Sequence, residues 1–129
     1  MKNNGQCRVL VIDDDPMTRD VLKPMLSLLG AIVVGEAENG EEGIQAYGKH
    51  NPDITLLDIK MPGKDGVDTL KDIIGLDPNA VVIILTAVSD MELAESCLKF
   101  GARNYIRKGA GQAALNIMLK AELDLVTSS

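Results

Sequence analysis

Four short apolar runs of this sequence each end on side chains that can bind a metal ion or a phosphoryl group. These side chains are Asp13 and Asp14, Asp58, Thr86 and Lys108. If the runs are parallel strands of one sheet, their carboxyl ends share an edge and these groups meet there. Three carboxylates at such short range raise one another's pKa unless a cation neutralises them. Mg²⁺ favours carboxylate oxygens, and a hydroxyl and an ammonium suit a phosphoryl group beside it. The pattern predicts a phosphoryl-transfer site.

Asp58 is the candidate nucleophile of this site. Its carboxylate would attack phosphorus and form an acyl phosphate, while the metal ion neutralises charge on the phosphoryl oxygens. Lys108 would pair with one of these oxygens, and Thr86 would donate its hydroxyl to another. No general base is needed, because a carboxylate is already ionised at neutral pH. The single histidine, His50, has no partner for a triad or a metal site and is expected to be a surface residue.

Apolar, β-branched runs alternate along the chain with segments of helical periodicity. Strands are predicted at Arg8–Ile12, Ile32–Ala37, Ile54–Asp58, Val81–Thr86 and Asn104–Arg107. Helices are predicted over Met17–Leu29 and Glu41–His50, from a cap at Asp65 through Leu76, from a cap at Ser89 or Asp90 through Phe100, and over Gln112–Val126. Strands that are apolar throughout are typical of parallel sheets covered on both faces. The sequence therefore predicts an α/β, doubly wound, five-stranded parallel sheet with five helices.

The first predicted helix has clear start signals and one internal breaker. Asp15 can cap it, and Pro16 suits its first turn. Pro24 should kink the helix or reduce its stability. An apolar stripe at helical spacing is expected to lie mostly in the core. The stripe consists of Met17, Val21, Leu22 and Met25.

Composition limits the class of protein. The chain has 129 residues, 46% of them hydrophobic but only 2% aromatic, so one domain with an aliphatic core is expected. The net charge of -6 argues against a nucleic-acid or anionic membrane surface. Cys7 and Cys97 lack metal or redox spacing and are expected to be reduced thiols. No secretory signal or membrane span is visible, so a cytoplasmic location is expected.

Four motifs, in this order, resemble the receiver domain of bacterial two-component response regulators, especially stand-alone receivers of the chemotaxis type. The motifs are the pair Asp13-Asp14, DIKMPGKDG at Asp58–Gly66, ILTA at Ile84–Ala87 and YIRK at Tyr105–Lys108. The resemblance covers about Arg8 to Val126. It implies a flavodoxin-like fold with strand order 2-1-3-4-5 and a single receiver domain over residues 1–129.

The resemblance also implies roles for single residues. Asp58 would be phosphorylated and would bind Mg²⁺ directly together with Asp14. Asp13 would act through water, and Lys60 would give its backbone carbonyl. Mn²⁺ could substitute for Mg²⁺. A long Lys60 side chain could shield the acyl phosphate from water, which implies slow self-dephosphorylation.

Thr86 and Tyr105 are implied to form the switch. Thr86 would follow the phosphoryl group inward, and Tyr105 would rotate into the vacated space. The surface of the fourth helix, fifth strand and fifth helix would then change partners. The family usually has proline after the lysine, whereas Gly109 follows Lys108 here. That departure implies a looser loop and a less firmly placed Lys108.

The implied partners are a sensor histidine kinase or histidine phosphotransfer protein and an unknown downstream protein. An exposed edge of the first-helix stripe could dock the kinase. No direct nucleic-acid or membrane contact is implied, and the chain would be a monomer or a phosphorylation-dependent dimer. It would catalyse only its own phosphotransfer and dephosphorylation. The Met1 start and short tail slightly favour a stand-alone receiver over one excised from a longer regulator or hybrid kinase.

Three other functions fit parts of the sequence. A haloacid-dehalogenase-like phosphatase also uses an aspartate nucleophile, but it needs a second aspartate where Lys60 stands. A degenerate receiver would bind partners without phosphate, which the acidic pair and Asp58 argue against. Residues Gly109–Ala114 fit GxGxxA, but no strand follows and no acidic ribose ligand is in place, so a dinucleotide site is disfavoured.

Overall fold

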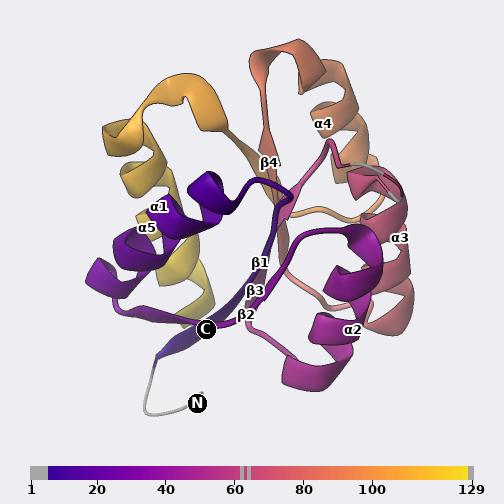
Figure 1. Cartoon of the computed structure of the whole chain (residues 1–129), viewed down its shortest axis with the longest axis horizontal. Coiled ribbons are helices and arrows are strands. Elements are labelled where there is room, and N and C mark those ends of the chain that lie inside the picture. The colour runs from indigo at the N-terminus through magenta and orange to yellow at the C-terminus, as the bar shows by residue number, and fades with distance from the viewer. Residues whose placement is uncertain (1–5, 62, 64, 128–129) are drawn as a thin grey trace.

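A computed structural model describes residues 6–61, 63 and 65–127, which form a parallel sheet with helices on both faces (Figure 1). The strands are β1 (Cys7–Ile12), β2 (Ala31–Ala37), β3 (Ile54–Asp58), β4 (Val82–Thr86) and β5 (Asn104–Arg107). The helices are α1 (Pro16–Leu28), α2 (Gly40–His50), α3 (Gly66–Leu76), α4 (Met91–Lys99) and α5 (Gln112–Thr127), with 3₁₀ turns η2 (Val88–Asp90) and η3 (Lys108–Ala110). The order β2-β1-β3-β4-β5 confirms the predicted flavodoxin-like sheet.

The sheet separates two apolar cores, because successive side chains of a strand point to opposite faces. In β1, Val9 and Val11 join the core under α1 and α5, whereas Leu10 and Ile12 join the core under α2, α3 and α4. Figure 1 shows the same division of the helices between the two faces. The central strands are therefore fixed from both sides, and their carboxyl ends are held at one edge.

Side-chain caps set the first residues of three helices. Asp15 accepts a hydrogen bond from the N–H of Met17, which confirms the predicted cap of α1. Asn39 caps α2 in the same way, and Asp65 caps α3 as predicted. Each cap follows the end of a strand or its loop, so the chain turns back over the sheet immediately.

The prediction that the first-helix stripe is mostly core is wrong for two of its residues. Met17 is 74% exposed and Val21 39% exposed, whereas Leu22 and Leu26 are buried. The side of α1 that meets the sheet is centred on Leu22 and Leu26, and the 3.6-residue period places Met17 almost opposite to it. The helix continues through Pro24, and the predicted loss of stability there stays a prediction.

Among the described residues, no helix combines the length and the apolar character needed to cross a bilayer.

The half-buried His50, at the end of α2, packs its ring against Gly35 of β2. A Cβ at Gly35 would come within 2.8 Å of the His50 Cδ2 atom. His50 of α2 thus packs against β2, whereas the sequence predicts a simple surface residue.

Candidate functional site

Three carboxylates meet at the carboxyl edge of the sheet, as the sequence predicts. Asp13 and Asp14 follow β1, and Asp58 ends β3, which is the neighbouring strand. One oxygen from each of the three carboxylates lies within 4.8 Å of the others. Asp13 and Asp58 are buried, whereas Asp14 is exposed at the mouth. Two buried aspartates and one exposed aspartate at this spacing fit a hard divalent cation that keeps some of its waters.

Lys108 follows the edge strand β5, and its side chain reaches into the acidic cluster. Its Nζ atom lies 2.8 Å from Asp13 Oδ2 and 3.3 Å from Asp58 Oδ1. Burial of Lys108 lowers its pKa, but the bond to Asp13 and the charge of Asp58 outweigh burial, so the pKa is raised. Lys108 is therefore a cation that contacts both carboxylates, and the effect of Gly109 on its placement stays a prediction.

The surroundings of Asp58 raise the pKa of its carboxyl group. Burial first, and then the charge of Asp13, raises its pKa from 3.8 to about 7, although Lys108 acts in the opposite direction. One cation thus only partly compensates a pair of buried carboxylates. A divalent cation at the same position would favour the ionised form, which is the nucleophilic form.

Thr86 and Tyr105 lie on the same face of the sheet, toward α4. Ile84 pairs with Tyr105 across the β4–β5 ladder, and Thr86 follows Ile84 by two residues. Tyr105 is half-buried and packs against the core under α2, α3 and α4. Thr86 is fully buried, and its hydroxyl donates to the backbone carbonyl of Ala87 at 3.0 Å. The hydroxyl must therefore exchange this partner before it can bind a phosphoryl oxygen.

Lys60 stands on the loop that follows Asp58. Its N–H points to Asp58 Oδ1 at 3.4 Å, and its side chain is 68% exposed. The Lys60 ammonium lies 3.7 Å from Asp90 Oδ1, at the start of α4. Sequence reasoning assigned Lys60 to the metal and to shielding, and it did not find Asp90 as its partner.

Gly66 fixes the path of the same loop. Its N–H donates to the Ile59 carbonyl at 2.9 Å. A Cβ at Gly66 would come within 2.5 Å of the Ile59 Cα and 2.6 Å of the Asp58 carbonyl oxygen. Only glycine lets α3 start this close to the strand end, so Gly66 supports the site although it bears no functional group.

Arg19 of α1 is another supporting residue of the site. Its guanidinium donates to the backbone carbonyl of Asp13 and pairs with Glu36 at 3.2 Å. Arg19 thereby ties α1 and β2 to the backbone of the acidic loop. The recognisable signal was the position of a long cation one turn after the acidic pair.

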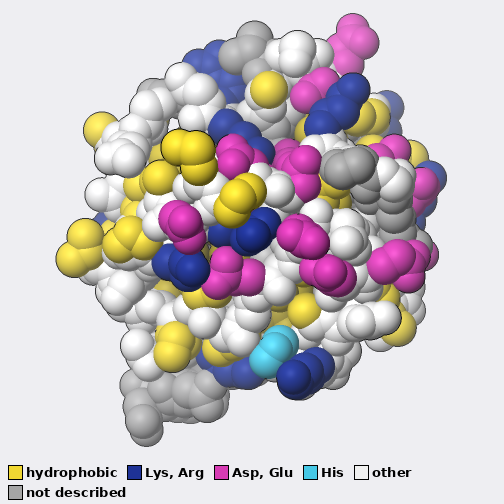
Figure 2. Space-filling view, viewed as in Figure 1, with side chains coloured by type: hydrophobic (Ala, Val, Ile, Leu, Met, Phe, Trp, Pro, Cys, Tyr) yellow, Lys and Arg dark blue, Asp and Glu magenta, His cyan; other side chains and the backbone are white. Residues whose placement is uncertain are grey.

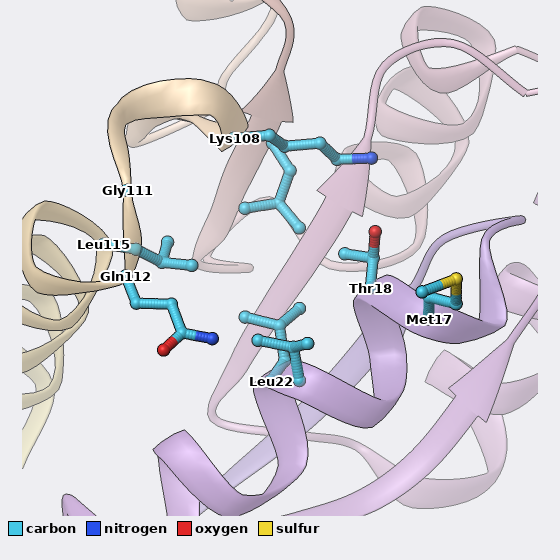
Figure 3. A pocket seen from close by; sticks show the side chains of 9 residues that line it. Met17, Thr18, Leu22, Lys108, Gly111, Gln112 and Leu115 are labelled. Atoms are coloured by element: carbon cyan, nitrogen blue, oxygen red, sulfur yellow. The ribbon is translucent and has the colours of Figure 1, made fainter.

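An apolar pocket of about 280 Å³ lies beside the acidic cluster, between α1 and the start of α5 (Figure 3). Its walls include Met17, Leu22 and Leu115, and Lys108 lines its inner end. In Figure 3 the Lys108 side chain extends away from Gln112, across the strand ends. Figure 2 shows acidic side chains gathered near the centre of this view and hydrophobic ones on the side where α1 and α5 lie. The site therefore has a charged side and an apolar side.

Comparison with known proteins agrees with this geometry. Residues 9–120 match the family described as response regulator receiver domain. The chemotaxis protein CheY of Thermotoga maritima is 39% identical over 78% of this chain and 84% of its own length. A probable C4-dicarboxylate response regulator of Priestia megaterium is 41% identical over 82% of this chain, which spans only 47% of that protein.

Solved structures show the same relationship. A chain of the CheX–CheY–BeF3–Mg complex from Borrelia burgdorferi superposes with a TM-score of 0.80 at 33% identity, covering 89% of this chain and 86% of that chain. The response regulator domain of Thermotoga maritima CheB gives 0.85 at 28% identity, covering 96% and 98%. The comparisons favour the receiver over the phosphatase that shares its nucleophile. The chain belongs to the response regulator receiver domain family.

Proposed function

We propose that Asp58 accepts a phosphoryl group from the phosphohistidine of a sensor histidine kinase or a histidine phosphotransfer protein. Membership of the family makes the chain a CheY-like, phospho-accepting signalling domain. The observation that supports Asp58 as the acceptor is its position in the acidic cluster. It lies 3.3 Å from the Lys108 ammonium and within 4.8 Å of carboxylate oxygens of Asp13 and Asp14.

The transfer is an in-line displacement at phosphorus. A carboxylate oxygen of Asp58 forms the new P–O bond, the P–N bond to the donor histidine breaks, and its electron pair returns to the imidazole. Lys108 neutralises one phosphoryl oxygen from its position beside Asp58 and Asp13. Thr86 exchanges its bond to Ala87 for a bond to the phosphoryl group.

Asp13, Asp14, Asp58 and the backbone carbonyl of Lys60 would hold Mg²⁺, or Mn²⁺ in its place. The bound ion supplies positive charge that offsets the carboxylates and the phosphoryl oxygens. The cluster of three carboxylates is the observation that fits this cation, since one lysine leaves the pKa of Asp58 at about 7.

Thr86 and Tyr105 then transmit the modification to the surface of α4, β5 and α5. The two side chains lie on the same sheet face, so the inward movement of Thr86 opens space toward Tyr105. Tyr105 rotates into this space, and the surface exchanges its downstream protein partner.

The phosphodonor docks on the apolar side of the site. Met17 is 74% exposed beside the 280 Å³ pocket, and Lys108 lines the same pocket. An apolar side chain of the donor that enters this pocket would lie next to the acidic cluster.

The whole core, about residues 8–126, acts as a single receiver domain in the cytoplasm. It acts as a monomer or a phosphorylation-dependent dimer, without direct contact to nucleic acid or membranes. It turns over no substrate beyond its own phosphotransfer and dephosphorylation.

Intact-protein mass spectrometry after incubation with acetyl phosphate and Mg²⁺ tests the proposal. One added phosphoryl group is expected on the wild type and none on Asp58→Ala. A wild type that never gains the group, although circular dichroism shows it folded, would make the chain a degenerate receiver.

A further inference from the structure

An ion pair connects the loop after the phosphorylation site to the start of α4. Lys60 is two residues after Asp58, and Asp90 is the last residue of η2, immediately before α4. The Lys60 ammonium lies 3.7 Å from Asp90 Oδ1. The Asp90 side chain is only 15% exposed, whereas that of Lys60 is 68% exposed. This contact is called the Lys60–Asp90 bridge below.

Asp90 occupies the N-cap position of α4 but does not cap it. Asp15, Asn39 and Asp65 occupy the same position in α1, α2 and α3, and each accepts a hydrogen bond from the first turn. Asp90 accepts none from the first turn of α4. Aspartate is among the best N-cap residues. The side chain is therefore chemically fit for a role that it does not fill here.

The backbone of Asp90 explains why the cap is not made. The three capping residues are extended, with ψ of 110°, 172° and 175°. Asp90 has φ −110° and ψ 18°, because its N–H closes the 3₁₀ turn on the Ala87 carbonyl at 3.0 Å. Capping thus requires Asp90 to leave this turn and become extended. The start of α4 is in this turned arrangement, and a capped arrangement would need a different backbone conformation at Asp90.

Both contacts that favour the turned arrangement involve groups of the phosphorylation site. The first is the Lys60–Asp90 bridge. The second passes through the Ala87 carbonyl, which accepts the Thr86 hydroxyl and the Asp90 N–H together. A change at Asp58 that draws away the ammonium of Lys60 therefore acts directly on the Asp90 side chain.

We propose that phosphorylation of Asp58 breaks the Lys60–Asp90 bridge and releases Asp90 to cap α4 at the N–H of Glu92 or Leu93. This inference rests on the proposed function. A bound divalent ion and Lys108 balance the three carboxylates, and the phosphoryl group adds about one further negative charge. Lys60, on the adjacent loop, turns to that charge. An ion pair at 3.7 Å with a largely exposed lysine is weak enough to be exchanged in this way.

The consequence is a change at the N-terminal end of α4, and α4 is part of the proposed partner surface. In the unphosphorylated chain the first turn of α4 lacks a side-chain cap, so its N–H groups have no capping oxygen from Asp90. In the phosphorylated chain Asp90 satisfies one of these groups and brings a negative charge to the positive end of the helix. The α4 surface that a partner meets is ordered by the modification.

Amide hydrogen exchange of Leu93, measured by NMR, reports the cap directly. Phosphorylation of the wild type with acetyl phosphate and Mg²⁺ should slow this exchange about fivefold, the factor that matches a typical cap. Asp90→Asn keeps the capping oxygen but cannot form the bridge, and Lys60→Met removes the bridge from the other side. Both variants should show slow exchange without phosphorylation. Asp90→Ala should show fast exchange in both states, and Lys120→Met is the control for loss of a surface lysine.

The outcomes separate this inference from the proposed function, because mass spectrometry of the same samples counts the phosphoryl groups. A phosphorylated wild type with unchanged Leu93 exchange overturns the release of Asp90 and leaves the phosphorylation intact. Absence of the phosphoryl group overturns the proposed function. In that case the unphosphorylated variants still show whether the Lys60–Asp90 bridge keeps Asp90 from capping α4. Exchange in Lys60→Met that equals the wild type means that the bridge does not hold Asp90 away from α4.

Discussion

The substitution Asp58→Asn should make the metal-free protein more stable at alkaline pH. Asparagine keeps the shape of the side chain and removes the buried charge that Asp13 repels. The pKa of Asp58 rises from 3.8 to about 7 on folding, and each pKa unit corresponds to about 1.4 kcal/mol. The ionised Asp58 thus opposes folding by at most about 4 kcal/mol. Entry of water and movement of Lys108 toward Asp58 would make this free energy smaller.

The sign of the pH dependence follows from the raised pKa. The folded state binds more protons than the unfolded state between pH 4 and about pH 7. The wild type therefore loses stability as pH rises through this window, and above it the loss is complete. Asp58→Asn lacks this dependence, so its advantage should be largest at pH 8, about 1.5 kcal/mol at pH 5, about 0.5 kcal/mol at pH 4 and absent below about pH 3.

Urea denaturation in EDTA at pH 5 and pH 8 measures both differences. Adding Mg²⁺ at pH 8 should then stabilise the wild type more than Asp58→Asn, because the cation needs the carboxylate. A variant that is less stable than the wild type at pH 8, or an advantage that does not grow with pH, would refute the argument that Asp58 is a repelled, buried carboxyl group.

Three further substitutions probe the surroundings of Asp58. Lys108→Met should slow phosphorylation by acetyl phosphate at least about tenfold, because it removes the cation that neutralises the phosphoryl oxygen; an unchanged rate would exclude the assigned role. Gly66→Ala should cost about 1–3 kcal/mol in urea denaturation, because its Cβ meets backbone at 2.5 Å, whereas Gly75→Ala in the same helix meets nothing within 4 Å and should cost nothing. Lys60→Asn should release phosphate faster than the wild type in a phosphate-release assay if Lys60 shields the acyl phosphate, and equal rates would contradict that shielding.

The strands and the strand-end residues could be predicted from the sequence. The bounds of β3 and β5 agree with prediction, and β1 starts one residue earlier. Strands buried on both faces are apolar throughout, and each stops where a polar residue must reach the edge. That rule is sufficient to bring Asp13, Asp58 and Lys108 together before any distance is known.

The parts that prediction missed depend on neighbours that are distant in sequence. Met17 and Leu26 lie on opposite faces of α1, and only the line of contact with the sheet decides that the face of Leu26 is buried and that Met17 is exposed. The pairing of Lys60 with Asp90 joins two loops. The capping propensity of Asp90 is visible in the sequence, but the 3₁₀ turn that prevents capping is not.

Peptide mass spectrometry after borohydride reduction tests the central claim most directly. Borohydride converts an aspartyl phosphate into homoserine and leaves free aspartate unchanged, so the reduced residue marks the phosphorylated position. After incubation with acetyl phosphate, we expect homoserine at position 58, dependent on Mg²⁺. Homoserine at Asp13 or Asp14 instead, or at no position while the protein is folded and Mg²⁺ is present, would contradict it.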